Sequence, residues 1–173
     1  MPRVSMIDPQ EHPELAPLID RIRAERDGQL LKLYRILLNS PSLTDGWRAF
    51  FTAVRKEAKL PDRDRELAVM AVAVLTRSRY EYDQHRPHAL KAGLSDEQID
   101  AVPQWKESSV FDERERAVLA YAEAMTVDIQ VPDTVAETVA GFLDARELVE
   151  LTATVAGYNM VARFLEAINL TEE

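Results

Sequence analysis

The chain contains no cysteine among its 173 residues. This absence excludes disulfides, zinc–thiolate sites, thiol nucleophiles and dithiol redox chemistry from the residues of this chain. The sequence also lacks an apolar run of about 18 residues, so it predicts no membrane span. The opening segment MPRVSMIDPQEHPEL has no apolar stretch of the secretory type, and the expected location is therefore cytoplasmic.

Basic residues are outnumbered by acidic ones. Lys and Arg total 21 against 30 Asp and Glu, which gives a net charge of −9 and an isoelectric point near 4.9. An acidic surface repels phosphate backbones and anionic lipids, so neither a nucleic-acid partner nor a membrane partner is expected. A cationic or neutral partner, or a small molecule in a locally basic pocket, is compatible with this charge.

The sequence is rich in apolar residues at helical spacing, and it shows no two-residue alternation typical of strands. The length suits a single domain over residues 1–173. We therefore predict an all-α domain of about eight or nine helices, with a break in the last pattern at Gly157. The expected helices cover residues 12–28, 29–40, 42–60, 61–78 and 78–92, a short segment capped by Ser95 and Gln98 after Gly93, and residues 111–128, 132–143 and 144–170.

Two of the expected helices begin with similar sequences. The segment RELAVMAVAV begins at Arg65, and RELVELTATV begins at Arg146. An internal duplication would produce this echo, with two related helix pairs lining one pocket. Two buried helices that converge on the same composition would produce it as well.

The stretch TRSRYEYDQHRPHALKAGLSDEQI, residues 76–99, holds two of the three histidines. In a helix, Ser78, Glu81, His85 and His88 fall on one face at spacings of three and four. A carboxylate beside an imidazole fixes its tautomer and raises its proton affinity, which gives an acid/base group near neutral pH. The spacing therefore predicts a Glu81–His85 pair, with a solvated helix face as the alternative interpretation.

A metal site built on Glu81, His85 and His88 is a weaker alternative. Pro87 lies between the two histidines, disturbs the backbone and removes one helical hydrogen bond. The chain also lacks the HExxH pattern of zinc peptidases. We therefore expect no metal site.

Other polar residues interrupt apolar helices. Glu66 precedes the run LAVMAVAVL, where it is either solvated at a helix start or buried and paired. Tyr158, Asn159 and Arg163 lie in GYNMVARFLEAI, where they form either a solvated face or a pocket wall for an acidic ligand. Tyr82 is expected at the edge of the polar helix face described above.

From LPDRDRELAVMAVAVLTRSRYEYDQH through ALKAGLSDEQIDAV, the chain resembles the carboxymuconolactone decarboxylase family, which includes the AhpD-like alkylhydroperoxidases. The resemblance is good over about residues 60–102 and loose over about 30–170, which leaves 1–29 as an N-terminal helical extension. It implies a small helical domain built around a helical hairpin. It also implies a homo-oligomer, as a trimer, dimer or hexamer.

The peroxidase branch of this family carries a glutamate, then CxxC, then a histidine four residues after the second cysteine. Position by position, these residues fall on Glu66, Ser78, Glu81 and His85. Serine and glutamate cannot form a disulfide, so thiol-dependent peroxidase activity is not expected of this chain.

The resemblance instead implies a cofactor-free acid/base enzyme that decarboxylates or isomerises a small organic acid or lactone. His85 is expected to move the proton, while Glu81 and Glu66 tune or relay it. The alternative is a non-catalytic ligand-binding or oligomeric scaffold that kept the fold. Substrate contacts are expected from five residues, Ser78, Tyr82, Tyr158, Asn159 and Arg163.

Overall fold

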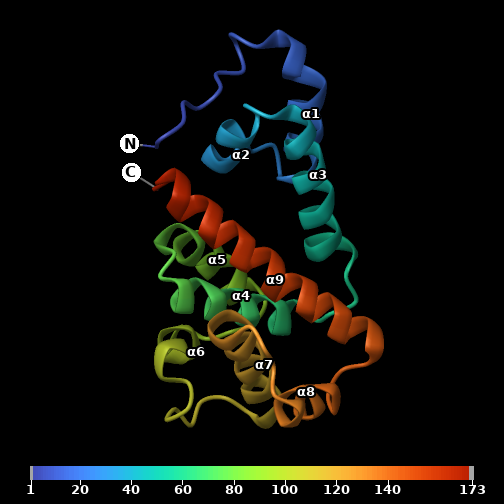
Figure 1. Cartoon of the computed structure of the whole chain (residues 1–173), viewed down its shortest axis with the longest axis vertical. Helices are drawn as coiled ribbons and strands as arrows, with labels where there is room; N and C mark the ends of the chain where they lie inside the picture. The colour runs from blue at the N-terminus through green and yellow to red at the C-terminus, as the bar shows by residue number, and fades with distance from the viewer. Residues whose placement is uncertain (1, 172–173) are drawn as a thin grey trace. The chain divides into compact units, whose positions relative to one another are not determined.

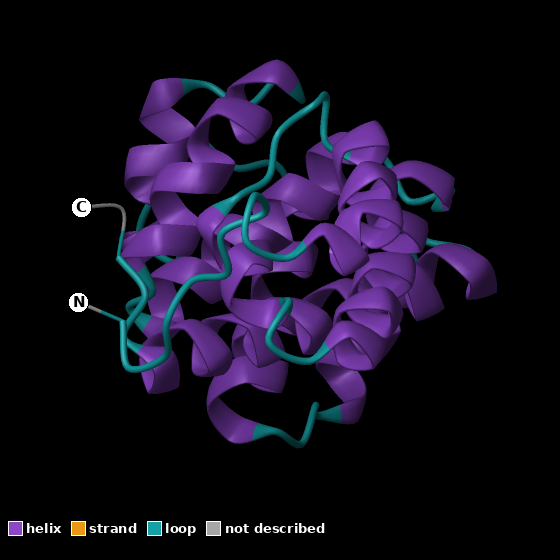
Figure 2. Ribbon diagram, turned by 90° about the horizontal axis from the view of Figure 1, so that it is seen from above, coloured by secondary structure: helices purple, strands orange, loops and turns teal. Residues whose placement is uncertain are grey.

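The computed structural model describes residues 2–171, and this part of the chain contains helices and no strand (Figures 1 and 2). It divides into two compact units, Met1–Glu57 with Ala167–Glu173, and Ala58–Glu166. The all-α fold class is confirmed. That the two units act as one domain stays a prediction.

The first unit contains a short 3₁₀ helix, three α-helices and a π-helical turn. Its core includes Trp47 and Phe51, whose ring centroids lie 5.2 Å apart, whereas Phe50 beside them is 40% exposed. Two of these three aromatic side chains are therefore buried. The elements are η1 (Pro13–Leu15), α1 (Ala16–Glu25), α2 (Lys32–Leu37), α3 (Pro41–Thr52) and η2 (Ala53–Glu57).

The second unit is organised around α4, Asp62–Thr76, in which every residue from Asp64 to Ala73 is buried. A helix that is apolar nearly all round is stable only when it is enclosed, and α4 packs against both α5 and α7. The other elements are α5 (Arg79–Lys91), α6 (Asp96–Ala101), η3 (Val102–Gln104), α7 (Glu113–Glu123), the π-turn η4 (Ala124–Asp128), α8 (Asp133–Ala140) and α9 (Ala145–Ile168).

The junction between α5 and α6 follows the sequence signals closely. Gly93 takes φ of 93°, and the Leu94 amide donates to the Ala89 carbonyl at 3.0 Å, which is a Schellman ending. Ser95 and Gln98 then form both bonds of a capping box at the start of α6. Both of these predictions are confirmed, and the junction sets where α5 ends and α6 begins.

A second capping box, which the sequence analysis did not predict, starts α7. The carboxylate of Glu115 accepts a hydrogen bond from the amide of Asp112. It also accepts hydrogen bonds from the side chains of Arg63 at 2.6 Å and Gln98 at 3.1 Å. Arg63 additionally donates to the Gly93 carbonyl. This buried carboxylate therefore ties α7 to α4 and α6.

The long helix predicted over residues 144–170 is confirmed, and α9 runs without interruption through Gly157, where the apolar pattern breaks. Glycine inside a helix costs only about 1 kcal/mol relative to alanine. Val155, Tyr158 and Val161 are buried around it and offset that cost. Both copies of the internal echo lie in helices, so both explanations of it stay open. No helix within residues 2–171 combines the length and apolarity needed to cross a membrane.

Candidate functional site

Glu66 on α4 and His85 on α5 form a hydrogen-bonded pair, which we call the acid/base pair. His85 Nδ1 lies 2.9 Å from Glu66 Oε2. The glutamate side chain is 4% exposed and the histidine 13%. An ionised carboxylate can only accept, so Nδ1 donates and Nε2 is left as the basic nitrogen of the neutral ring.

Arg65 completes the electrostatics around Glu66. Its Nε donates to Glu66 Oε1 at 3.2 Å, and its Nη1 donates to Asp62 Oδ1 at 2.8 Å. Burial raises the pKa of Glu66, but the hydrogen bond to His85 and the charges of His85, Arg65 and His88 outweigh burial, so the pKa is lowered overall. Glu66 is therefore ionised at neutral pH.

Two rings fix the orientation of the His85 imidazole. The buried Tyr158 of α9 meets it edge-on, with ring centroids 4.8 Å apart and an interplanar angle of 88°. His88 lies one helical turn further along α5, with its centroid at 5.6 Å. Helices α4, α5 and α9 of the second unit thus meet around one imidazole.

The partner of His85 differs from the one predicted. The sequence spacing favoured Glu81, whereas the structure pairs the imidazole with Glu66. Helical spacing identifies side chains that are neighbours on one helix, but it does not reveal which side chains of another helix pack against them. The helix face with Ser78, Glu81, His85 and His88 is not fully solvated either, since Glu81 is only 2% exposed.

Glu81 and Ser78 are buried without hydrogen-bond partners. The two carboxyl oxygens of Glu81 and the hydroxyl of Ser78 find neither a donor nor an acceptor, and Ser78 is 1% exposed. Leaving such a buried group unsatisfied costs about 1–3 kcal/mol. Burial, and secondarily the negative charge of Glu166, raise the pKa of Glu81 to about 8. At pH 7 the neutral acid therefore predominates, and it carries one O–H donor.

Three residues predicted to bind substrate form hydrogen bonds away from the acid/base pair: Tyr82, Asn159 and Arg163. The Tyr82 hydroxyl accepts from Arg86 at 3.2 Å. Asn159 donates to Thr126 at 2.9 Å, and the exposed Arg163 donates to the Asn159 side chain at 2.6 Å. None of these bonds reaches the acid/base pair. Their role in substrate binding stays a prediction.

The metal alternative gains no support from the geometry. Over residues 2–171, no group of three or more His, Asp or Glu side chains is arranged to hold a metal ion. Arg65 was not predicted as part of the site, although its place beside Glu66 in the segment "REL" was the available signal.

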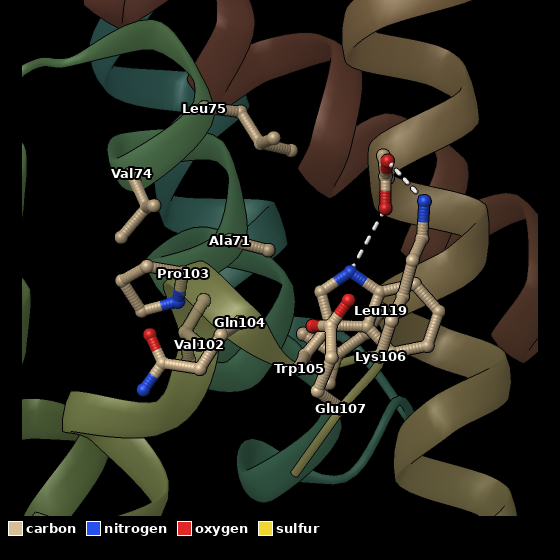
Figure 3. Close-up of a pocket in the computed structure, with 11 residues that line it drawn as sticks. Ala71, Val74, Leu75, Val102, Pro103, Gln104, Trp105, Lys106, Glu107 and Leu119 are labelled. Atoms are coloured by element: carbon tan, nitrogen blue, oxygen red, sulfur yellow. Dashed lines mark hydrogen bonds and ion pairs between the residues drawn. The ribbon is translucent and has the colours of Figure 1, made fainter.

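A separate cavity of about 190 Å³ lies between α4, η3 and α7 (Figure 3). Its lining includes the apolar side chains of Ala71, Leu75 and Leu119 and the ring of Trp105. The Trp105 indole and the Lys106 ammonium donate to the two oxygens of Glu123 at 2.8 and 2.7 Å. None of the predicted site residues lines this cavity.

The sequence matches a known family over nearly half of its length. Residues 41–124 match the model of the carboxymuconolactone decarboxylase family. The uncharacterized protein YnjA of Escherichia coli (strain K12) is 39% identical over 83 residues. That alignment covers 47% of this chain and 45% of YnjA, so it spans less than half of the relative.

Solved structures extend the likeness of the fold. The AhpD-type protein ATU0492 of unknown function from Agrobacterium tumefaciens has a TM-score of 0.74 at 24% identity, over 79% of this chain and 94% of that one. The AhpD core of a peroxidase-related protein from Ralstonia eutropha JMP134 has a TM-score of 0.83 at 16% identity, over 99% and 92%. A variant of the debrominase Bmp8, solved in complex with 2,3,4-tribromopyrrole, has a TM-score of 0.82 at 17% identity, over 99% and 91%.

Residues 41–124 thus match the carboxymuconolactone decarboxylase family, and the fold of the described residues is similar to that of AhpD-like structures. The chain contains no cysteine, and Ser78 and Glu81 stand at the positions where the resemblance places the thiols of the peroxidase branch.

Proposed function

We propose that this chain is a cofactor-free acid/base enzyme that decarboxylates or isomerises a small organic acid or lactone. The observation that carries the proposal is the 2.9 Å hydrogen bond between Glu66 and His85. An imidazole held by a buried carboxylate is the arrangement that general acid/base catalysis uses near neutral pH. The proposal also fits a chain without cysteine, because proton transfer needs no thiol.

The chemistry follows from the two nitrogens of His85. Glu66 holds the proton on Nδ1, so Nε2 accepts a proton from a carbon acid and later returns it. The ionised Glu66 then stabilises the imidazolium, as a carboxylate partner does in hydrolase triads. In decarboxylation Nε2 first takes a proton from solvent and then gives it to the carbanion that remains when CO₂ leaves. In isomerisation Nε2 removes a proton from the substrate and returns it to another carbon. One histidine serves both reactions.

The surroundings support this role. Arg65 offsets the charge of the buried Glu66, and Tyr158 packs against the imidazole and holds its plane. The 13% exposure of the His85 side chain leaves part of the ring open to a small substrate. As the resemblance implies, we expect a homo-oligomer, which light scattering after gel filtration would test.

The test is a substrate screen with a matched histidine control. Wild-type protein is incubated with β-keto acids and unsaturated carboxylated lactones, and CO₂ release and carbon-bound deuterium uptake from D₂O are followed. His85→Gln is expected to abolish both signals while helix content stays unchanged. His12→Gln is the control, because His12 makes the same 2.9 Å bond to Glu14 at an exposed position of the first unit.

The alternative function is a non-catalytic binding or scaffold protein. It predicts no turnover and no deuterium uptake with any member of the panel. Activity that survives His85→Gln at the wild-type level would sink the acid/base assignment, whichever substrate responds.

A further inference from the structure

Capping boxes start three helices of the second unit, and a fourth helix has the residues for one but does not form it. Both reciprocal bonds are made at the starts of α6, α7 and α9, by Ser95 with Gln98, Asp112 with Glu115, and Asp144 with Glu147. Ser78 and Glu81 have the same spacing at the start of α5 and form neither bond. The Ser78 amide donates instead to the Ala73 carbonyl at 2.9 Å.

The unused capping pair is turned into the protein interior. Both side chains are more than nine-tenths buried, and their polar atoms have no partner. The boxes formed elsewhere in the unit show that the sequence makes such bonds readily. Two buried, unpartnered hydroxyl-bearing groups on the face of α5 that carries His85 therefore call for a ligand that supplies the missing partner.

We propose that Ser78 and Glu81 form a subsite that donates two hydrogen bonds to the oxygen of an enolate-forming substrate. The inference rests on the proposed function and assigns the two groups that bind the carbonyl oxygen of the substrate. That oxygen lies against Ser78 and Glu81, and the reacting carbon of the substrate lies against His85 Nε2.

The charges around the subsite agree with a neutral donor. Glu81 lies four residues before His85 on α5, and the negative charge of Glu166 on α9 acts on its carboxyl group. An ionised Glu81 would repel both Glu166 and an enolate. A carboxylic acid kept neutral by its surroundings instead donates to the developing oxyanion.

The reaction is balanced without a further reagent. In decarboxylation, the bond between the carboxylate carbon and the α-carbon breaks, CO₂ leaves, and the electron pair moves onto the carbonyl oxygen. The hydroxyls of Glu81 and Ser78 donate to that oxygen. The α-carbon then takes the proton of protonated His85 Nε2, which solvent replaces.

Binding of small substituted phenols tests the subsite without turnover, because a phenolate spreads charge onto its oxygen as an enolate does. Affinity is measured by calorimetry for wild type, Glu81→Leu, Glu81→Gln, Ser78→Ala and the control Ser95→Ala. Glu81→Leu and Ser78→Ala are each expected to weaken binding by about tenfold or more, as the loss of one hydrogen bond to a charged oxygen does. Glu81→Gln keeps a neutral donor and is expected to retain most of the affinity, and Ser95→Ala all of it.

Infrared difference spectra of wild type and Glu81→Gln provide a second readout if Glu81→Leu does not fold. A protonated-carboxyl stretch that belongs to Glu81 and shifts when the phenol binds supports the subsite. Absence of phenol binding, or binding indifferent to both residues, overturns it.

The outcomes separate this inference from the proposed function. Phenol binding that depends on Ser78 and Glu81, without turnover of any acid or lactone, would support the proposed subsite and contradict the proposed enzymatic function. Turnover that depends on His85, with phenol binding unchanged in both subsite variants, would support the proposed enzymatic function and contradict the proposed subsite.

Discussion

The buried carboxyl of Glu81 makes a large prediction about stability and pH. Its pKa rises from 4.5 to about 8 in the folded protein, because it is buried and because Glu166 adds a negative charge. The folded state therefore holds a proton that the unfolded chain releases between these two values. Stability is unaffected by this group below pH 4.5, falls as pH rises through the interval, and levels off above pH 8.

The magnitude follows from the size of the shift. One pKa unit corresponds to about 1.4 kcal/mol, so the full interval corresponds to roughly 5 kcal/mol and the part below pH 7 to roughly 3 kcal/mol. These values are upper bounds, because a buried site relaxes and admits water when it ionises. Glu81→Gln removes the titration, so we expect the variant to gain stability over wild type progressively between pH 5 and 8.

The assay is urea denaturation of wild type and Glu81→Gln at several pH values. The difference in unfolding free energy should grow by a few kcal/mol from about pH 5 to about pH 8. Glu166→Gln should reduce the slope of wild type partly, and the exposed Glu137→Gln should leave it unchanged. A difference that is flat with pH would refute the claim that Glu81 is buried as a neutral acid.

Two further predictions concern the residues that cap helices. Ser95→Ala should lower the unfolding free energy in urea denaturation by about 1 kcal/mol, because a formed cap is lost. Ser78→Ala should not lower it, because Ser78 forms no cap; equal losses in the two variants would mean that Ser78 also caps its helix. Glu115→Ala should cost about 3 kcal/mol by the same assay, because Arg63 and Gln98 lose their common acceptor; a loss below about 1 kcal/mol would contradict its role in joining the helices.

Local signals in the sequence were sufficient for the helices and for one junction. Gly93, Ser95 and Gln98 act through their own backbone and nearest neighbours, so their positions predicted the ending of α5 and the start of α6. The box that starts α7 carried an equal signal and was not predicted. At Gly157 the predicted helix continues, because burial of the neighbouring residues outweighs the weak helix propensity of glycine.

The candidate site was predictable only in part. The family resemblance pointed to Glu66 and His85, but spacing along α5 favoured Glu81 as the partner of the imidazole. The pairing across α4 and α5 depends on how two helices pack, which no local pattern encodes. Burial of Glu81 has the same origin, and with it the pKa shift that distinguishes this carboxyl from an exposed one.

The central claim is that Glu66 fixes the His85 imidazole with its proton on Nδ1. Long-range ¹H–¹⁵N NMR of the His85 ring tests it directly, at a pH where the ring is neutral. The account predicts a protonated Nδ1 and an unprotonated Nε2 in wild type, and loss of this preference in Glu66→Gln. A ring protonated on Nε2, or a tautomer that is the same in both proteins, would contradict it.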